Sequence, residues 1–209
     1  MNGGTLSVVE KGCAAISDPF AGKLPVVSAG NCTFNNKTYD GSSVTLNPGT
    51  YCGWTNFNGS PTITFNPGLY VISGGGMNIN SGAKLTGNGV TFYFADSNSK
   101  IQLNGTTTAT LTAPTSGIYS DILMFEPSGL AKSPLTFNET PGSTLRGLMY
   151  LPSRQVTFNN TSTLSAEMIG MVFATLTVNT TNWNFQAGSP NMSRTITTSS
   201  GTPVPYLTN

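Results

Sequence analysis

The chain has 209 residues, enough for one domain or at most two, and its charge is sparse, with nine Lys or Arg and eight Asp or Glu. Charged residues make up 8% of the chain, against roughly a quarter in an average soluble domain. With a formal net charge of +1, these scattered cations cannot form the basic surface of a nucleic-acid-binding protein. The lack of histidine excludes Ser-His-Asp and Cys-His catalysis, and any metal site that depends on imidazole.

Small polar residues replace the missing charges, with 31 Thr and 21 Asn beside 24 Gly and 13 Pro. Thr favours strands, whereas Asn, Gly and Pro favour turns, so the composition predicts many short strands joined by tight turns. No stretch approaches the roughly 20 apolar residues that span a bilayer. The first residues lack the basic and apolar regions of an export signal, so a signal or membrane anchor is expected upstream of Met1 if the protein is exported.

The chain divides into three segments by pattern. Residues 1–40 show no repeat and are expected to form an N-terminal cap and lead-in, in which Ser7 to Ala15 suit a short helix or irregular cap. Residues 41–192 carry a repeat. Residues 193–209, rich in Thr, Ser and Pro, are expected to form a final strand and a loosely held tail.

The repeat shows in two patterns. Val44 to Tyr51 (VTLNPGTY) recurs nineteen residues later as Ile63 to Tyr70 (ITFNPGLY). The pattern apolar-x-apolar-Asn recurs at intervals of 22, 24, 34, 21 and 20 residues after a degenerate first copy, and its asparagines are Asn58, Asn80, Asn104, Asn138, Asn159 and Asn179. The one long interval holds an insertion around Tyr119 to Ser133.

Short, nearly continuous apolar runs lie between these asparagines, at 89–94, 121–125, 147–151 and 170–174. Such runs are typical of parallel strands that are covered on both faces. A repeat of about 21 residues is too short for a βαβ unit, which needs about 30 or more. The sequence therefore predicts an all-β fold, a single-stranded parallel β-helix of about seven or eight coils.

In a parallel β-helix, equivalent side chains of successive coils stack about 4.8 Å apart. The six recurring asparagines are therefore expected to form a hydrogen-bonded ladder at one corner, although Asn also ends strands in ordinary all-β proteins. Cys32 and Cys52 are twenty residues apart, which would place them at the same angular position in adjacent coils, and a disulfide between them is predicted. Cys13 is left over, either buried as a small apolar side chain or paired outside these residues.

Several segments then resemble one family. They are the NPGxYCG element at 47–53, the NPGxYxxxGG element at 66–75, ATLTAPTSGIYSDILMFE at 109–126 and STLRGLMYLPSRQVTFNN at 143–160. They are similar to the secreted C-terminal region of bacterial TadG-like proteins, which are associated with Flp-type tight-adherence pili. The resemblance covers residues 13 to about 185, and Trp54 departs from it because a second glycine usually follows Cys-Gly.

The resemblance implies an exported β-solenoid, periplasmic or at the cell surface, whose partners are pilus or envelope components. It implies contact with a membrane only through an anchor outside these residues, and it brings no catalytic residues. The sequence thus favours a non-enzymatic structural or adhesive module of a bacterial pilus or cell-envelope apparatus.

Two alternatives stay open, a polysaccharide-degrading enzyme being the first. Parallel β-helices support polysaccharide lyases and hydrolases, which use paired carboxylates or a calcium-binding acidic cluster. The best such constellation lies near the insertion and combines Asp121, Glu126, Glu139 and Arg146 or Arg154. Asp121 and Glu126 are expected at opposite ends of one strand, and these charges are better explained as solvated surface groups, so no activity, metal or cofactor is predicted.

Surface recognition is the second alternative. Exposed aromatic side chains could stack on the sugar rings of a surface glycan, and the candidates are Trp54, Tyr119 and Trp183. Thr-x-Thr pairs at 62–64, 106–108, 175–177 and 195–197 are of the kind that binds ice or crystalline polymers. Their intervals are too irregular for one array, and Thr is in any case a common exposed strand residue.

Overall fold

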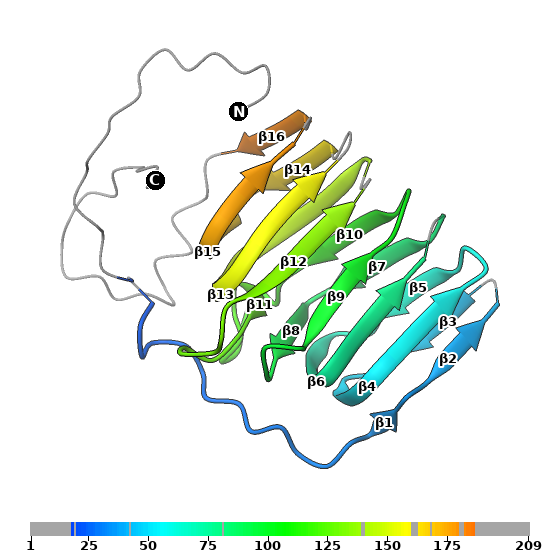
Figure 1. The fold of residues 1–209 in the computed structure, drawn as a ribbon, viewed down its shortest axis with the longest axis horizontal. Coiled ribbons are helices and arrows are strands. Elements are labelled where there is room, and N and C mark those ends of the chain that lie inside the picture. The colour runs from blue at the N-terminus through cyan, green and yellow to red at the C-terminus, as the bar shows by residue number, and fades with distance from the viewer. Residues whose placement is uncertain are drawn as a thin grey trace.

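The structure is a computed structural model that describes residues 18, 20–41, 43–80, 82–138, 141–159, 163–167, 169–179 and 182–186, without the side chains of 163–167, 169 and 182–186. The described part is all-β and contains no helix. Its 16 strands stack in parallel as a β-solenoid of about six turns, which Figure 1 shows from the side. The predicted fold class is thereby confirmed, although the described part has about six turns and the sequence predicted seven or eight coils.

The strands in chain order are β1 (Phe34–Asn35), β2 (Thr38–Asp40), β3 (Ser43–Leu46), β4 (Gly49–Asn58), β5 (Thr62–Phe65), β6 (Gly68–Ile79), β7 (Lys84–Asn88), β8 (Val90–Phe94), β9 (Lys100–Leu103), β10 (Thr108–Thr112), β11 (Ile122–Phe125), β12 (Ser133–Asn138), β13 (Ser143–Asn159), β14 (Thr163–Glu167), β15 (Ile169–Val178) and β16 (Asn182–Gln186).

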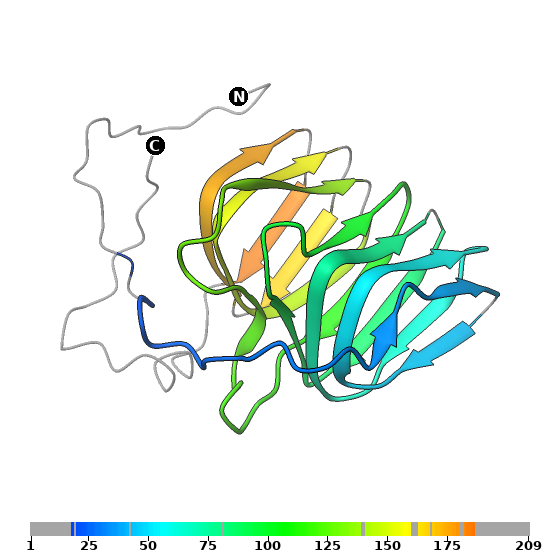
Figure 2. The same ribbon diagram turned by 60° about the horizontal axis from the view of Figure 1, so that its bottom comes forward.

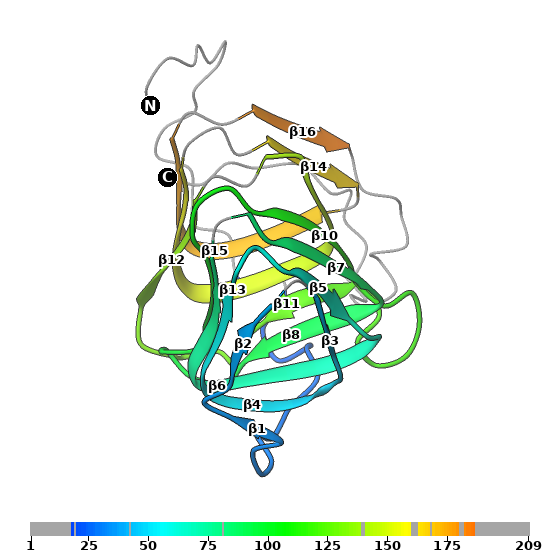
Figure 3. The same cartoon turned by 90° about the vertical axis from the view of Figure 1, so that its right-hand side faces the viewer.

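Each turn has three sides, which Figure 3 shows from the end where β1, β2 and β3 lie. Face 1 contains β1, β8, β11 and the first halves of β4, β6 and β15. Face 2 contains β2, β9, β12 and the second halves of the same three strands. Face 3 contains β3, β5, β7, β10, β14 and β16, and the long β13 passes from face 3 through face 1 to face 2.

The interior is built from columns of equivalent side chains. On face 3, Val44 pairs with Ile63, and Ile63 pairs with Leu85 in the next turn. On face 1, the rings of Phe34, Tyr51, Tyr70 and Phe92 follow one another with centroid distances of 4.4, 5.9 and 5.4 Å. Burial of these columns is the main source of stability, because each turn covers the apolar side chains of the turn before it.

Face 1 is apolar on its outer side as well. Every residue of β8 and β11 is buried, as the continuous apolar runs predicted. The lead-in, residues 20–33, passes along the outside of this face toward β1, as Figures 1 and 2 show. Phe20 lies 5.8 Å from the Tyr150 ring, and the Tyr150 hydroxyl donates a 2.6 Å hydrogen bond to Asp18 Oδ2. The lead-in therefore covers the flank of the solenoid, whereas the expected cap at Ser7 to Ala15 and the tail at 193–209 lie outside the described residues.

The predicted disulfide between Cys32 and Cys52 is confirmed, with a Cα–Cα distance of 5.7 Å. The expected reason was wrong, because the strand register places Asn35, rather than Cys32, beside Cys52. Cys32 instead lies just before β1, at the end of the lead-in, so the bridge fastens this segment to β4. A structural disulfide indicates an oxidising compartment. Cys13 lies outside the described residues.

Candidate functional site

The three corners of the solenoid differ in how regular they are. The Asn corner joins face 2 to face 3 and is defined by the six recurring asparagines, whereas the NPG corner joins face 3 to face 1 at 47–49, 66–68 and 88–89. The Gly corner joins face 1 to face 2 at Gly53, 74–75, 95–99, 126–132 and 152–154.

The Asn corner carries a ladder of side-chain amides. Each Nδ2 group donates to the residue one turn earlier, at 2.7–3.3 Å, in the pairs Asn58 to Asp40, Asn80 to Asn58, Asn104 to Asn80, Asn159 to Asn138 and Asn179 to Asn159. The strand register also places Asn138 beside Asn159. The asparagine amides thus bond mainly to one another and link successive turns, so the Asn corner has a structural role.

The NPG corner shows the role of the repeated NPGxY element, which the sequence alone left open. The Asn66 amide donates to Asn47 Oδ1 at 2.7 Å, which adds a second, shorter ladder. The single hydroxyl proton of Tyr70 is shared between the carbonyl oxygens of Asn66 and Leu46, at oxygen–oxygen distances of 2.7 and 2.9 Å. Burial raises the pKa of Tyr70 to about 12, so the phenol stays neutral and keeps both bonds. The tyrosine of NPGxY therefore holds its corner from the inside of the solenoid.

The candidate enzymatic carboxylates do not come together. Asp121 and Glu126 lie at opposite ends of β11, as expected, and Glu139 lies outside the described residues. The insertion around Tyr119 to Ser133 is not a single exposed loop, because its middle part forms β11, a buried strand of face 1. The extra residues form two separate loops, one at each end of β11.

Glu126 and Arg154 form a buried ion pair, so the expectation that these two charges are solvated surface groups was wrong. Both residues are at most 2% exposed, and Arg154 Nε lies 2.6 Å from Glu126 Oε2. The other carboxylate oxygen accepts the backbone N–H of Ser153 at 2.7 Å. The guanidinium also donates to the Ser97 and Asp96 carbonyl oxygens and to Ser133 Oγ, at 2.9, 2.8 and 2.7 Å.

This network fastens three loops of the Gly corner to one side chain. The pairing was not visible in the sequence, because Arg154 is 28 residues from Glu126 and 58 residues from Asp96. A guanidinium with several fixed donors suits such a clamp better than a lysine would. Since both oxygens of Glu126 accept structural hydrogen bonds, this acid is a positioning group of the Gly corner.

A groove of about 300 Å³ lies on the outer side of the same corner. Its lining is formed by Trp54, Gly74, Gly75, Ser97, Asn98, Lys100, Ser133 and Pro134. Trp54 is 37% exposed, and Lys100 Nζ lies 5.5 Å from the centroid of the Trp54 ring. Two groove residues, Ser97 and Ser133, are held directly by Arg154 from beneath.

The unequal lengths of the Gly-corner loops create this groove. In the early turns the Gly corner consists of glycine backbone. A side chain would not fit at Gly75, because its Cβ would lie 2.4 Å from the Gly53 carbonyl oxygen. In the later turns the loops 95–99 and 126–132 are longer, and the groove is lined by Ser97 and Asn98 of the first loop and by Ser133 and Pro134, which directly follow the second. Gly76 lies between Trp54 and Lys100 in the register and has no side chain, so the lysine can reach the indole across one turn.

Asp96 fixes the turn that forms one wall of the groove. Its Oδ1 accepts the N–H groups of Asn98 and Ser99 at 2.9 and 3.0 Å, and its Oδ2 accepts the N–H of Gly74 at 2.7 Å. Burial alone would raise the pKa of Asp96, but these hydrogen bonds outweigh it and lower the pKa below its ordinary value. The carboxylate is therefore ionised at neutral pH and ties the turn to the glycines.

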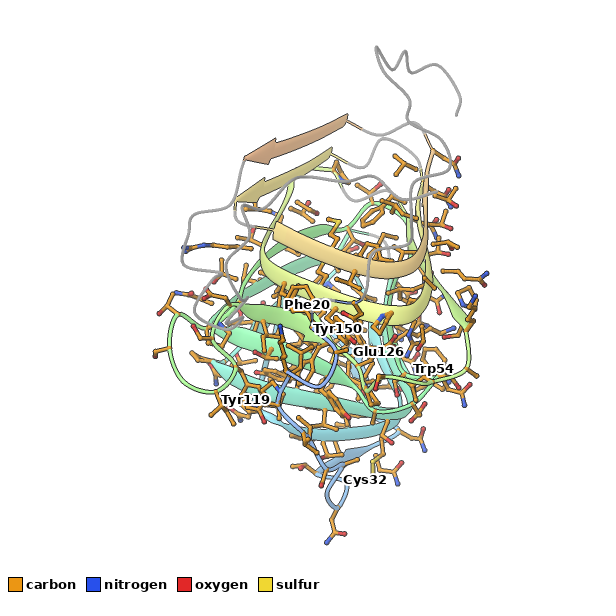
Figure 4. All side chains as sticks on the ribbon, turned by 90° about the vertical axis from the view of Figure 1, so that its left-hand side faces the viewer. Phe20, Cys32, Trp54, Tyr119, Glu126 and Tyr150 are labelled. Carbon is orange, nitrogen blue, oxygen red and sulfur yellow. A yellow bond between two sulfur atoms is a disulfide. The ribbon has the colours of Figure 1, made fainter. Side chains whose placement is uncertain are left out.

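The aromatic candidates do not form one platform. Trp54 follows the Gly corner, whereas Tyr119 precedes β11 and packs against Phe125 with a centroid distance of 6.1 Å. Figure 4 shows the two side chains on opposite sides of the view. Trp183 lies on β16, where the side chain is outside the described part. Of the three, Trp54 is the candidate that lines the groove.

The Thr-x-Thr pairs are spread over different faces, because 62–64 lies on face 3 and 175–177 on face 2, and 195–197 is outside the described residues. The register instead aligns a row that the sequence did not reveal on face 3: Thr45, Thr64, Thr86, Thr110 and Thr144. Lys84 lies in the neighbouring row on one side and Arg146 in the row on the other. The two cations interrupt the regular lattice that ice or a crystalline polymer requires.

In the part of the chain that the structure describes, no group of three or more His, Cys, Asp or Glu residues could hold a metal ion. Nor does any helix there have the length and apolarity needed to cross a bilayer. No family model matches the chain, and neither a curated protein nor a solved structure does. The class of protein that the structure defines is thus a parallel β-solenoid, and its function has to be inferred from the corners and the groove.

Proposed function

We propose that this chain is a non-enzymatic structural or adhesive module of a bacterial pilus or cell-envelope apparatus. The observation that carries the proposal is that Glu126 and Arg154, the candidate catalytic charges, form a buried ion pair that holds loops together. A general acid or base must reach a substrate proton, and a carboxylate with both oxygens bonded inside the protein does not.

The mechanism of such a module is mechanical. Stacked apolar columns and two asparagine ladders connect each turn to the next, which gives a stiff rod with few charges on its surface. A rod of this kind presents binding residues on its corner loops, and the sequences of these loops can vary without disturbing the stacked turns.

Export fits the same proposal. The Cys32–Cys52 disulfide requires an oxidising compartment, and the resemblance to TadG-like proteins favours the periplasm or the cell surface. Its partners would be other pilus or envelope components, and it would contact a membrane only through an anchor outside these residues.

Two measurements test this function. Antibody labelling of intact cells of the source organism should detect the protein, and deletion of its gene should lower attachment to surfaces. The purified protein should release no reducing ends and form no unsaturated uronate from a polysaccharide panel. Turnover by the purified protein, or labelling only after lysis with unchanged attachment, would contradict the proposal.

A further inference from the structure

We propose that the groove at the Gly corner binds an acidic saccharide, a sugar residue that carries a carboxylate. This inference rests on the proposed adhesive function and names its ligand class and its site. It is argued from three features of the groove: an exposed indole, one cation beside it, and walls that are fixed before a ligand arrives.

The indole of Trp54 provides the apolar surface. A pyranose ring presents a flat face of C–H groups, and a flat aromatic ring is the protein surface that packs best against it. Trp54 is 37% exposed, although tryptophan is highly buried on average, so the solenoid leaves part of this large apolar ring in solvent. The neighbouring glycines add no side chains that would cover it.

Lys100 provides the charge. It is the one ionisable residue among those that line the groove, and its ammonium lies 5.5 Å from the Trp54 ring centroid. A sugar that stacks on the indole would therefore place a carboxylate substituent beside the ammonium. Asp96 is not among the lining residues, and its carboxylate oxygens accept the N–H groups of Asn98, Ser99 and Gly74.

The remaining lining can hydrogen-bond to hydroxyl groups. Ser97, Asn98 and Ser133 provide hydroxyl and amide groups around the groove, which is typical of sites that fix the orientation of a polar ligand. The volume of about 300 Å³ is at the lower end for small-molecule sites and suits one sugar residue within a longer chain.

The groove is also built in advance. Taking an ion pair out of water is unfavourable, and this chain has only eight acidic residues, yet it buries Glu126 and Arg154 directly beneath the groove. The clamp holds two lining residues of the groove, Ser97 of the loop 95–99 and Ser133 at the start of β12. Fixing these walls in the free protein removes an ordering cost from binding.

The test measures binding of defined oligosaccharides to the purified chain by isothermal titration calorimetry at low salt. The acidic probes are tetragalacturonate, a mannuronate tetramer and a hyaluronan tetrasaccharide, and the neutral probes are cellotetraose and chitotetraose. We expect saturable binding of at least one acidic probe, weaker binding of the neutral probes, and an affinity that falls as salt is added, because the charge pair is exposed.

Variants assign the binding to the groove. Trp54→Ala should weaken the binding at least about tenfold, since truncation of a central aromatic contact removes most of the packing. Lys100→Gln should weaken it about two- to fivefold and abolish its salt dependence, as expected for an exposed ion pair. Lys84→Gln on face 3 is the matched control and should bind like the parent, and melting curves must show that each variant is folded.

The outcomes separate this inference from the proposed function. No binding of any acidic probe, equal binding of neutral and acidic probes, or full binding by folded Trp54→Ala would overturn the groove proposal and leave the structural role intact. Chromatography of the same samples detects cleavage. Probe cleavage with Trp54-dependent binding would support the groove as a saccharide site and overturn the non-enzymatic function.

Discussion

The Asn corner and the Gly corner belong to the same turns, but they are built in opposite ways. At the Asn corner the first described turn ends face 2 with Asp40 and the later turns end it with an asparagine, and the asparagine amides bond to one another. At the Gly corner the connections grow from the single residue Gly53 to the loop 126–132, and no two turns are alike. Repetition therefore stabilises one edge of the solenoid, while variation along the other edge makes a groove.

The difference shows how a repeat protein can carry a site. A ladder needs the same side chain in every turn, so a substitution within it affects the turns on both sides. A corner without a ladder can take loops of any length, provided that something else fastens them. The Gly corner uses the Arg154 clamp and the Asp96 turn for that purpose.

The largest expected effect is the loss of the clamp at the Gly corner. Arg154→Met leaves Glu126 buried without its cation and should lower stability by about 3–5 kcal/mol, which is roughly 6–20 °C in Tm for a chain of this size. Differential scanning calorimetry measures the change. The double variant Glu126→Leu with Arg154→Met should recover part of the loss, and an unchanged Tm in Arg154→Met would show that the pair is not buried.

Removal of the disulfide should have the next largest effect. The bridge closes a loop with a sequence separation of 20 residues, and its loss through Cys32→Ser with Cys52→Ser should lower stability by about 3 kcal/mol. Urea unfolding of the oxidised parent and the variant gives the difference. Identical midpoints would mean that the lead-in holds to the solenoid without the bridge.

A substitution in the Asn ladder should have a moderate effect. Asn159→Ala removes its amide from between Asn138 and Asn179 and should lower stability by about 1–3 kcal/mol, which is several degrees in Tm. Asn98→Ala at the Gly corner is the control for the comparison, because this exposed residue should change stability by less than about 0.5 kcal/mol. Equal effects of the two substitutions would remove the distinction between the corners.

The smallest expected effect depends on pH. The pKa of Asp96 lies below its ordinary value of 3.8, so the ionised carboxylate stabilises the fold above that pH, and this stabilisation disappears as the pH falls through the lower, folded-state pKa. Asp96→Asn should therefore be less stable than the parent at pH 6, and the difference should shrink as the pH falls below 3.8. Melting curves across this range test the sign, and a difference that grows in acid would contradict it.

The sequence by itself was enough to predict the parallel β-solenoid. The apolar-x-apolar-Asn pattern predicted stacked turns with the asparagines at one corner, and the continuous apolar runs predicted strands covered on both sides. The spacing of Cys32 and Cys52 also led to the correct pair, although the register shows that they do not occupy equivalent positions. These features could be predicted because a repeat imposes the same local environment every turn.

The tertiary structure alone decided the rest. It paired Glu126 with Arg154, and it placed Lys100 beside Trp54 in a groove that Ser97, Asn98, Ser133 and Pro134 also line. The Glu126–Arg154 pair does not follow the period of the sequence, because its separation of 28 residues spans corner loops of unequal length. Periodic apolar burial fixes which strands stack, whereas the aperiodic loops fix which side chains meet, and the candidate site lies among the loops.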